Sequence, residues 1–455
     1  MRDTRDFDNE ARRLTKELRA SAERFRLGGS SPDPGPGPAE HRGRRTAIEF
    51  LSAGVLAVGV IAIILALSGH AVQTSKTTRP TPPAIVPPPT QPVVVSPPTP
   101  SALSAGKFIM DLTWVNDQTG WALSAAECAS GLCPELASTT DGGKTWHPLP
   151  NPPASIQNGT VNCDAVACIV HVRFATTTVG YLYGPALLVT SDGGRSWQRE
   201  QSLPVEALEP THGRVYRIVY DHTGCPGPCD RTLETAPDGS TTWRKVMTIP
   251  VTITSNPSAA LVLQGSQTIY IPIYGNLAAG AGTQQAIIFR SLDAGRTWRQ
   301  LSDPCGGSGT TVNDAVGFTA AAPSFAATLC SPRSGPNDGS GEFIVTSDNA
   351  GTSWGPPHPA PGLPEVIAAA SPTHLALATG PITGSGSVTY TLYVSTDGGS
   401  NWTLAVSDPE VLDPAGPGSA YLGFEDSLFG RWVGFEGAIW TTEDGGTHWS
   451  RRPFP

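Results

Sequence analysis

An aspartate, replaced once by asparagine, recurs seven times in a short motif of this 455-residue chain, and a tryptophan closes every copy. The copies are TTDGGKTW (139–146), TSDGGRSW (190–197), APDGSTTW (236–243), SLDAGRTW (291–298), SDNAGTSW (347–354), STDGGSNW (395–402) and TEDGGTHW (442–449). A carboxylate repeated so regularly suits three kinds of chemistry: acid–base catalysis, cation binding, or hydrogen bonding that holds a turn.

The residues around each carboxylate favour the third kind. Paired glycines such as Gly193 and Gly194 permit the positive φ of a tight hairpin, the carboxylate accepts hydrogen bonds from the turn, and the tryptophan covers the apolar underside. Ala294 replaces a glycine, Asn349 the aspartate and Ala236 the leading hydroxyl, exchanges that catalysis would not tolerate. We predict structural roles for Asp141, Trp146, Asp192, Trp197, Asp238, Trp243, Asp293, Trp298, Asn349, Trp354, Asp397, Trp402, Asp444 and Trp449.

The spacing of the motif predicts the fold. Successive tryptophans lie 51, 46, 55, 56, 48 and 47 residues apart, a period that suits one four-stranded antiparallel blade. In the segment 172–190 an apolar strand is followed by a turn and by the strands GYLYG and ALLVT. Seven such units predict an all-β, seven-bladed β-propeller over residues 105–455. A parallel β-solenoid is the alternative.

An uncharged apolar stretch, FLSAGVLAVGVIAIILALSG, occupies residues 50–69. It is long enough to cross a bilayer, and we predict an uncleaved transmembrane signal anchor over 48–69. Arg42, Arg44 and Arg45 precede it, so the N-terminus is expected in the cytoplasm and the propeller outside the cell membrane. A cleaved signal peptide is the competing interpretation, but its charged region would be about 45 residues long.

The segments on either side of the predicted anchor have different characters. In the cytoplasmic tail, 1–45, apolar residues recur at helical spacing, so 7–27 is expected to form an amphipathic helix. That helix either lies along the membrane surface or docks a cytoplasmic partner. Residues 70–104 are rich in proline and threonine, and ten prolines fall within 79–100. We predict a semi-rigid stalk of polyproline II type.

Charge and cysteine content agree with an extracytoplasmic domain. Residues 101–455 hold 17 Lys and Arg against 30 Asp and Glu, which argues against nucleic acid as a partner. All eight cysteines follow the predicted anchor, and an even number outside a membrane indicates disulfides. The pairs expected from proximity are Cys128 with Cys133, Cys163 with Cys168, Cys225 with Cys229, and Cys305 with Cys330.

The octapeptide resembles the Asp box, or BNR repeat, of sialidases, sortilin-type receptors and related propellers. Together with the preceding elements WVNDQTGWA and FATTTVGYL, it is most similar to propellers of photosystem II assembly factors and their bacterial relatives. The resemblance covers about 350 residues and implies the propeller fold, but one propeller architecture hosts many activities. The preference for Ala, Gly, Pro and Arg is typical of an actinobacterial-type sequence.

The residues favour binding over catalysis. A sialidase, which the resemblance includes, needs three arginines, a tyrosine nucleophile with a glutamate partner, and an aspartate acid/base. Arg173, Arg217 and Arg431 are candidates to face the central channel, with Tyr216, Tyr220 and Glu425 near such strands, but they form no tight constellation in the sequence. No histidine pair typical of a metal site and no cofactor-binding motif occurs. We therefore predict no cofactor.

The predicted function is that of a membrane-anchored, non-enzymatic binding or scaffold protein whose propeller recognises a protein or glycan. A cell-surface, sialidase-like exo-glycosidase is the first alternative, and a transmembrane sensor that signals through 7–27 is the second. The ligand is expected at the loops 305–314, 330–342 and 378–388, which are rich in Gly, Pro and Ser.

Overall fold

The computed structural model describes residues 107–128, 131–156, 168–221, 230–250, 258–274, 287–306, 313–332, 341–384, 387–411, 421–434, 438–452 and 454. All of them belong to the second of two compact units, 95–455. The predicted helix 7–27, anchor 48–69 and stalk 70–104 lie outside the described residues. Within the ranges that are described, no helix has the length and apolar character needed to cross a membrane.

Seven antiparallel sheets follow one another along the chain. Blade 1 consists of β1 (Lys107–Trp114), β2 (Gly120–Cys128), β3 (Gly131–Thr139) and β4 (His147–Pro148). Blade 2 consists of β7 (His171–Phe174), β8 (Gly180–Tyr183), β9 (Leu187–Thr190) and β10 (Gln198–Glu200). Blade 3 consists of β11 (Val205–Thr211), β12 (Arg214–Tyr220), β13 (Arg231–Pro237) and β14 (Arg244–Ile249). Blade 4 consists of β15 (Ser258–Ala259), β16 (Val262–Gln264), β17 (Thr268–Tyr274), β18 (Ile287–Ser291) and β19 (Arg299–Gln300).

The remaining blades repeat this plan. Blade 5 consists of β20 (Asn313–Ala322), β21 (Phe325–Pro332), β22 (Phe343–Ser347) and β23 (His358–Pro359). Blade 6 consists of β24 (Pro364–Ala369), β25 (Leu375–Gly384), β26 (Ser387–Ser395) and β27 (Thr403–Val411). Blade 7 consists of β28 (Tyr421–Phe424), β29 (Gly430–Val433), β30 (Ile439–Thr442) and β31 (Ser450–Arg452). A parallel pair, β5 (Ser155–Ile156) and β6 (Cys168–Ile169), connects blades 1 and 2.

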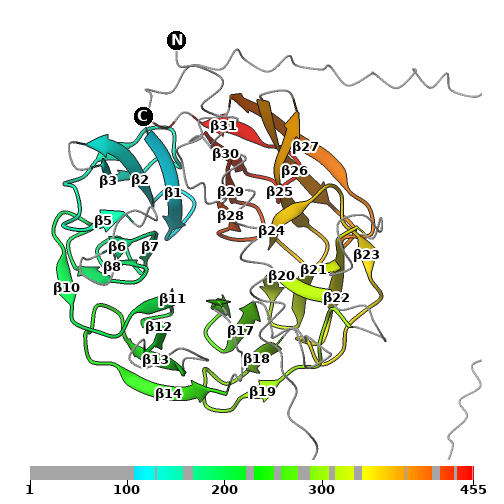
Figure 1. Ribbon diagram of the computed structural model, residues 1–455, viewed down its shortest axis with the longest axis horizontal. Helices are drawn as coiled ribbons and strands as arrows, with labels where there is room; N and C mark the ends of the chain where they lie inside the picture. Colours follow the sequence, from blue (N-terminus) through cyan, green and yellow to red (C-terminus); the bar gives the residue numbers. More distant parts are fainter. Residues whose placement is uncertain are drawn as a thin grey trace, which may run out of the picture. The chain divides into compact units, whose positions relative to one another are not determined.

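The seven sheets form a closed ring, so the predicted seven-bladed propeller is confirmed (Figure 1). The first strand of each blade is the inner strand, and in blade 4 the two short strands β15 and β16, which both pair with β17, share this place. Strand β1 contacts β7, β7 contacts β11, and the contacts continue through β16, β20 and β24 to β28. Strand β28 contacts β1 and closes the ring. Among the described residues, the first and last blades share no strand, because each blade sheet uses strands that follow one another in the chain.

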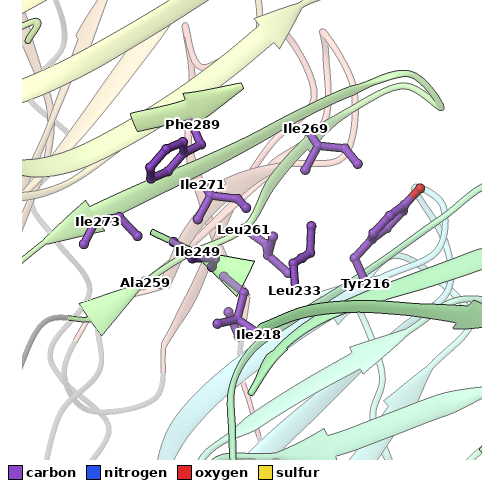
Figure 2. Packing of buried hydrophobic residues seen from close by; sticks show 11 residues of the cluster. Tyr216, Ile218, Leu233, Ile249, Ala259, Leu261, Ile269, Ile271, Ile273 and Phe289 are labelled. Atoms are coloured by element: carbon purple, nitrogen blue, oxygen red, sulfur yellow. The ribbon is translucent and has the colours of Figure 1, made fainter. Parts of the chain in front are cut away.

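The core lies between neighbouring blades. The two middle strands of blade 2, β8 and β9, are buried along their whole length, whereas β10 is largely exposed. Figure 2 shows the contact between blades 3 and 4, where Tyr216, Ile218 and Leu233 pack with Ile269 and Ile271. Each blade buries its apolar faces against its two neighbours, so a single blade is stable only within the ring.

Antiparallel pairing separates the turns into two ends of the ring. The turns between first and second strands, and the octapeptides between third and fourth strands, lie at one end, the turn end. Turns between second and third strands, and the connections between blades, lie at the other, the loop end. The predicted loop 378–388 is mostly strand instead, because β25 continues to Gly384 and β26 begins at Ser387.

The disulfides lie at the loop end. Cys128 and Cys133 are bonded across the turn between β2 and β3, and Cys305 is bonded to Cys330, the two predicted pairs that the described residues contain. Cys168 is also disulfide-bonded. Its predicted partner Cys163 lies outside the described residues, as does the predicted pair Cys225 and Cys229.

Candidate functional site

The carboxylates of the octapeptide turns are occupied by hydrogen bonds within the turn. Thr190 Oγ1 donates to Asp192 Oδ1 (2.8 Å) and accepts from Gly194 N (3.1 Å). Asp192 Oδ1 also accepts from Ser196 N (2.9 Å), and Oδ2 accepts from Ser196 Oγ (2.5 Å). The hydrogen bonds from Ser196 lower the pKa of Asp192 to about 2. The corresponding bonds recur at Asp141, Asp293, Asp397 and Asp444.

Two turns depart from this arrangement. In blade 5, Asn349 Oδ1 accepts from Ser353 N (2.9 Å) and its Nδ2 donates to Ser353 Oγ (2.8 Å), so the amide replaces the carboxylate. In blade 3, Ala236 has no hydroxyl to donate. There Asp238 Oδ1 is buried without a hydrogen-bond partner among the described residues, and burial raises the pKa of the carboxyl. The predicted hydrogen-bonding pattern therefore does not extend to the blade 3 turn.

Two of the three arginines singled out from the sequence are buried on second strands. Arg217 on β12 is paired with Glu200 (Nη1 to Oε1, 3.0 Å) and Glu234 (Nη2 to Oε2, 2.9 Å), and its guanidinium lies 3.8 Å from the Trp243 ring centroid. Since Glu200 belongs to blade 2, this arginine joins two blades.

Arg431 on β29 has a similar role between blades 7 and 1. Its guanidinium lies 4.3 Å from the Trp114 ring centroid, and Nη2 donates to the Asp117 carbonyl (3.2 Å). Nη1 lies 3.6 Å from Glu425 Oε2. The side chain of Glu425 is 8% exposed, and burial raises its pKa to about 7. These residues form the seam at which the ring closes.

The third arginine, Arg173, lies on an inner strand, β7, and joins three blades. Its Nη1 donates to Asp111 Oδ2 on β1 (2.7 Å), and its Nε donates to Glu209 Oε1 on β11 (2.6 Å). His171 Nδ1 lies 3.2 Å from the same Asp111 oxygen. We call Asp111, His171, Arg173 and Glu209 the inner-strand cluster.

A β-bulge places Asp111 in this cluster. The register of β1 against β2 shifts between Ile109 and Asp111. The carboxylate then accepts hydrogen bonds from Leu112 N (2.9 Å) and from Val172 N (3.0 Å) on the inner edge of β7. Thr113 Oγ1 accepts from the next free amide on that edge, Phe174 N (3.1 Å). Side chains of blade 1 thus accept hydrogen bonds from backbone amides of blade 2 that are not paired with a neighbouring described strand.

The two carboxylates of the cluster have oppositely shifted pKa values. Burial raises the pKa of Asp111, but the Arg173 charge and the His171 hydrogen bond outweigh it, so the pKa lies below its usual value. For Glu209 burial outweighs the attraction of Arg173, and the pKa is raised. Tyr421 of blade 7 lies within electrostatic reach of all three charged groups, and burial raises its pKa. Side chains from blades 1, 2, 3 and 7 therefore influence one another's pKa values.

The sequence reasoning missed Asp111, His171, Glu209 and Tyr421. A signal for three of them exists: Asp111, His171 and Tyr421 each stand three residues before the aromatic residue that ends the inner strand of its blade. An alignment of the blades on those aromatics would have brought them together. In the part of the chain that the structure describes, no group of three or more His, Cys, Asp or Glu side chains is placed to hold a metal ion.

No family model and no curated protein matches the chain. Among solved structures, it is similar to YCF48 from Cyanidioschyzon merolae, with 14% identity over 75% of this chain and 97% of that chain and a TM-score of 0.47. It is similar to a PL25 polysaccharide lyase, an ulvan lyase, with 10% identity over 77% and 97% and a TM-score of 0.49. It is also similar to YCF48 bound to a D1 peptide, with 17% identity over 62% and 80% and a TM-score of 0.38. These neighbours include an enzyme and a protein with a bound peptide, and at such identities they assign no activity to this chain.

Proposed function

We propose that this chain is a non-catalytic binding protein, and that its propeller recognises a protein or glycan partner through the inner-strand cluster. In this proposal the segment 48–69 anchors the chain in the cell membrane, and 70–104 holds the propeller on the outer side. The observation that carries the proposal is that Arg173 forms two ion pairs, one with Asp111 of blade 1 and one with Glu209 of blade 3.

These two ion pairs support recognition because they hold the side chains of the inner-strand cluster in place before a partner binds. Asp111 is 5% exposed and already serves several internal donors, so it is poorly suited to attack a substrate or take up a proton. His171 and Glu209 are the more accessible members, with side chains 36% and 27% exposed. A partner that meets them does not have to order them first, which saves part of the entropy cost of binding.

The charge of the cluster indicates the chemistry of the group it receives. Two carboxylates face one guanidinium, so the cluster favours hydroxyl or amide donors, or a positively charged side chain, over an anion. Peptides and glycans both offer such groups.

Capture of the partner tests the proposal. The full-length chain is crosslinked in its native membrane, and the yield of partner is compared between wild type and the H171A/E209Q variant. The matched control, H147A/E127Q, changes the same residue types at exposed positions on blade 1. We expect the partner to be lost from H171A/E209Q and retained by the control. Equal capture by all three proteins would contradict the proposal.

A glycoside-processing enzyme is the second candidate. The observation that favours it is the pair Asp111 and Glu209, whose pKa values are moved apart within one cluster that also includes Tyr421. Sugar release by the full-length chain, measured on a panel of sialosides and anionic polysaccharides, tests it. Turnover that both D111N and E209Q abolish would establish this candidate and refute the binding proposal.

A further inference from the structure

The inner-strand cluster contains two polar atoms that are not used within the described part of the propeller. Glu209 Oε1 accepts from Arg173 Nε (2.6 Å), but Glu209 Oε2 has no hydrogen-bond partner among the described residues. His171 directs Nδ1 toward Asp111 Oδ2 (3.2 Å), and no described residue bonds to its Nε2. Neither Glu209 Oε2 nor His171 Nε2 is buried. These two atoms are therefore available to a ligand.

The surroundings of His171 determine which of its ring nitrogens is an acceptor. Asp111 accepts hydrogen bonds from two backbone amides and from Arg173 Nη1, so its carboxyl is ionised and can only accept. His171 Nδ1 therefore carries the hydrogen that points to Asp111, and in the neutral ring Nε2 is an acceptor. The ring also packs against Tyr183, with ring centroids 4.9 Å apart. These contacts fix the direction in which Nε2 points.

The cluster has more negative than positive charge. In the described part of the chain, Arg173 is the only arginine or lysine that forms an ion pair with Asp111 or Glu209, so one guanidinium faces two carboxylates. Burial outweighs the attraction of Arg173 at Glu209, and the pKa of this carboxyl is raised. The ionised form of Glu209 is therefore incompletely compensated, and a second cation beside Oε2 would stabilise it.

We propose that Glu209 Oε2 and His171 Nε2 together bind a primary ammonium group, the side chain of a lysine on a protein partner. An ammonium has three donors and a full positive charge, so one group can serve both acceptors and offset the excess negative charge. A hydroxyl is uncharged and has a single donor, so it can serve only one of them. This inference rests on the proposed function and names the group that the inner-strand cluster recognises.

Two other cationic groups fit these acceptors less well. A guanidinium binds best to both oxygens of one carboxylate, but Arg173 already occupies Glu209 Oε1. An amino sugar carries its ammonium directly on the sugar ring. The cluster lies on the inner strands β1, β7 and β11, so a ligand group has to reach the centre of the ring. The flexible four-carbon stem of lysine provides that reach.

A panel of defined probes tests the assignment on the full-length chain in detergent. Three of them are glycine–serine pentapeptides, blocked at both ends, whose central residue is lysine, arginine or acetyl-lysine, and the fourth is glucosamine. Titration calorimetry measures the dissociation constants. We expect the lysine peptide to bind about tenfold more tightly than each of the other three probes.

Variants of the two acceptors locate the binding site. H171F keeps a ring against Tyr183 but removes the Nε2 acceptor, and E209Q removes the negative charge at Oε2. Each is expected to weaken binding of the lysine peptide about tenfold. The matched control E127Q removes one exposed carboxylate from blade 1 and should change the affinity less than twofold. Thermal denaturation shows whether each variant is folded.

The outcomes separate this inference from the proposed function. Preference for the lysine peptide that is lost in H171F and E209Q and kept in E127Q supports the inference. Equal binding of the lysine and arginine peptides, tighter binding of glucosamine, equal weakening by E127Q, or no binding of any probe would overturn it. The proposed function is judged by whether H171A/E209Q loses its partner. Loss of the partner without a preference for the lysine peptide would refute the ammonium site alone.

Discussion

At the scale of single residues, the hydroxyl that begins six of the seven octapeptides is as important as the aspartate. Ser291 Oγ donates to Asp293 Oδ1 (2.8 Å) and accepts from Gly295 N (2.8 Å), and the side chain is buried. The hydroxyl therefore connects the carboxylate to the backbone of the turn. Sequence reasoning identified both residue types, but it did not establish which one satisfies the glycine amide.

Replacement of this hydroxyl tests its role. S291A leaves the Gly295 amide without its acceptor, and we expect the free energy of unfolding to fall by about 1–3 kcal/mol. Urea denaturation measures the change. S266A, at an exposed position in the same blade, serves as the control and should alter stability by less than about 0.5 kcal/mol. Equal stability of the two variants would show that the hydroxyl is dispensable.

The turn carboxylates also predict sensitivity to acid. Hydrogen bonds lower the pKa values of Asp141, Asp192, Asp293 and Asp397 to about 2, below the usual value of 3.8. Their contribution is fully present above pH 4 and is lost as the pH falls toward 2, because the folded state then has to take up protons. Denaturation midpoints should drop over that range. The D293N/D397N variant should drop less steeply, and an identical slope would contradict this assignment.

At the scale of strands and turns, an aromatic residue covers a glycine in three blades. A Cβ added to Gly180 would lie 2.5 Å from the Phe174 ring, and the pairs of Trp114 with Gly120 and of Phe424 with Gly430 are equally close. The ring thus occupies the space where a side chain would stand. This explains the spacing between aromatic and glycine that the sequence repeats.

Substitution of one such glycine tests the packing. G180A forces the Phe174 ring away from Trp121, on which it stacks at 3.7 Å, and we expect a loss of about 1–3 kcal/mol in unfolding free energy. Thermal denaturation provides the measurement. Gly341 has no atom within 4 Å of its added Cβ, so G341A is the control and should be nearly neutral. A stable G180A protein would mean that the blade relaxes around the new methyl group.

At this scale the sequence could predict the features that depend on residues close together in the chain. The octapeptide turns, the strand order within a blade and the number of blades all depend on residues close together in the chain. The structure agrees with these predictions except at the blade 3 turn, where Asp238 Oδ1 has no partner among the described residues, and in blade 4, which has five strands. The inner-strand cluster depends on three strands from three blades and on a bulge at Asp111, which no local pattern encodes. The stretch 378–388 was predicted as a loop from its glycines, but cross-strand pairing continues through most of it.

At the scale of the whole molecule, the seam between blades 7 and 1 closes the ring, and the part of the chain that the structure describes contains no strand shared by these two blades. Arg431 reaches from β29 to Trp114 and to the Asp117 carbonyl of blade 1. Beside it, Glu425 is buried, and its oxygens accept no hydrogen bond from the described residues. A buried carboxyl of this kind favours its protonated form, which accounts for the raised pKa.

The seam therefore has a pH dependence opposite in sign to that of the octapeptide turns. The folded pKa of Glu425 is about 7 against an ordinary 4.5, so its penalty is absent below pH 4.5, grows as the pH rises and levels off above 7. E425Q removes the penalty. We expect the variant to be more stable than wild type by about 3 kcal/mol at pH 8 and equally stable at pH 4. Denaturation at the two pH values measures this, and a less stable variant at pH 8 would show that the ion pair with Arg431 prevails.

The most direct test of the account is to locate the partner on the propeller. A photo-crosslinking amino acid is introduced at position 171 in the inner-strand cluster or at position 147 on the exposed outer strand of blade 1, and the full-length chain is irradiated in its native membrane. The account predicts a crosslinked partner from position 171 and none from position 147. The same partner captured from position 147 alone would contradict recognition through the inner-strand cluster.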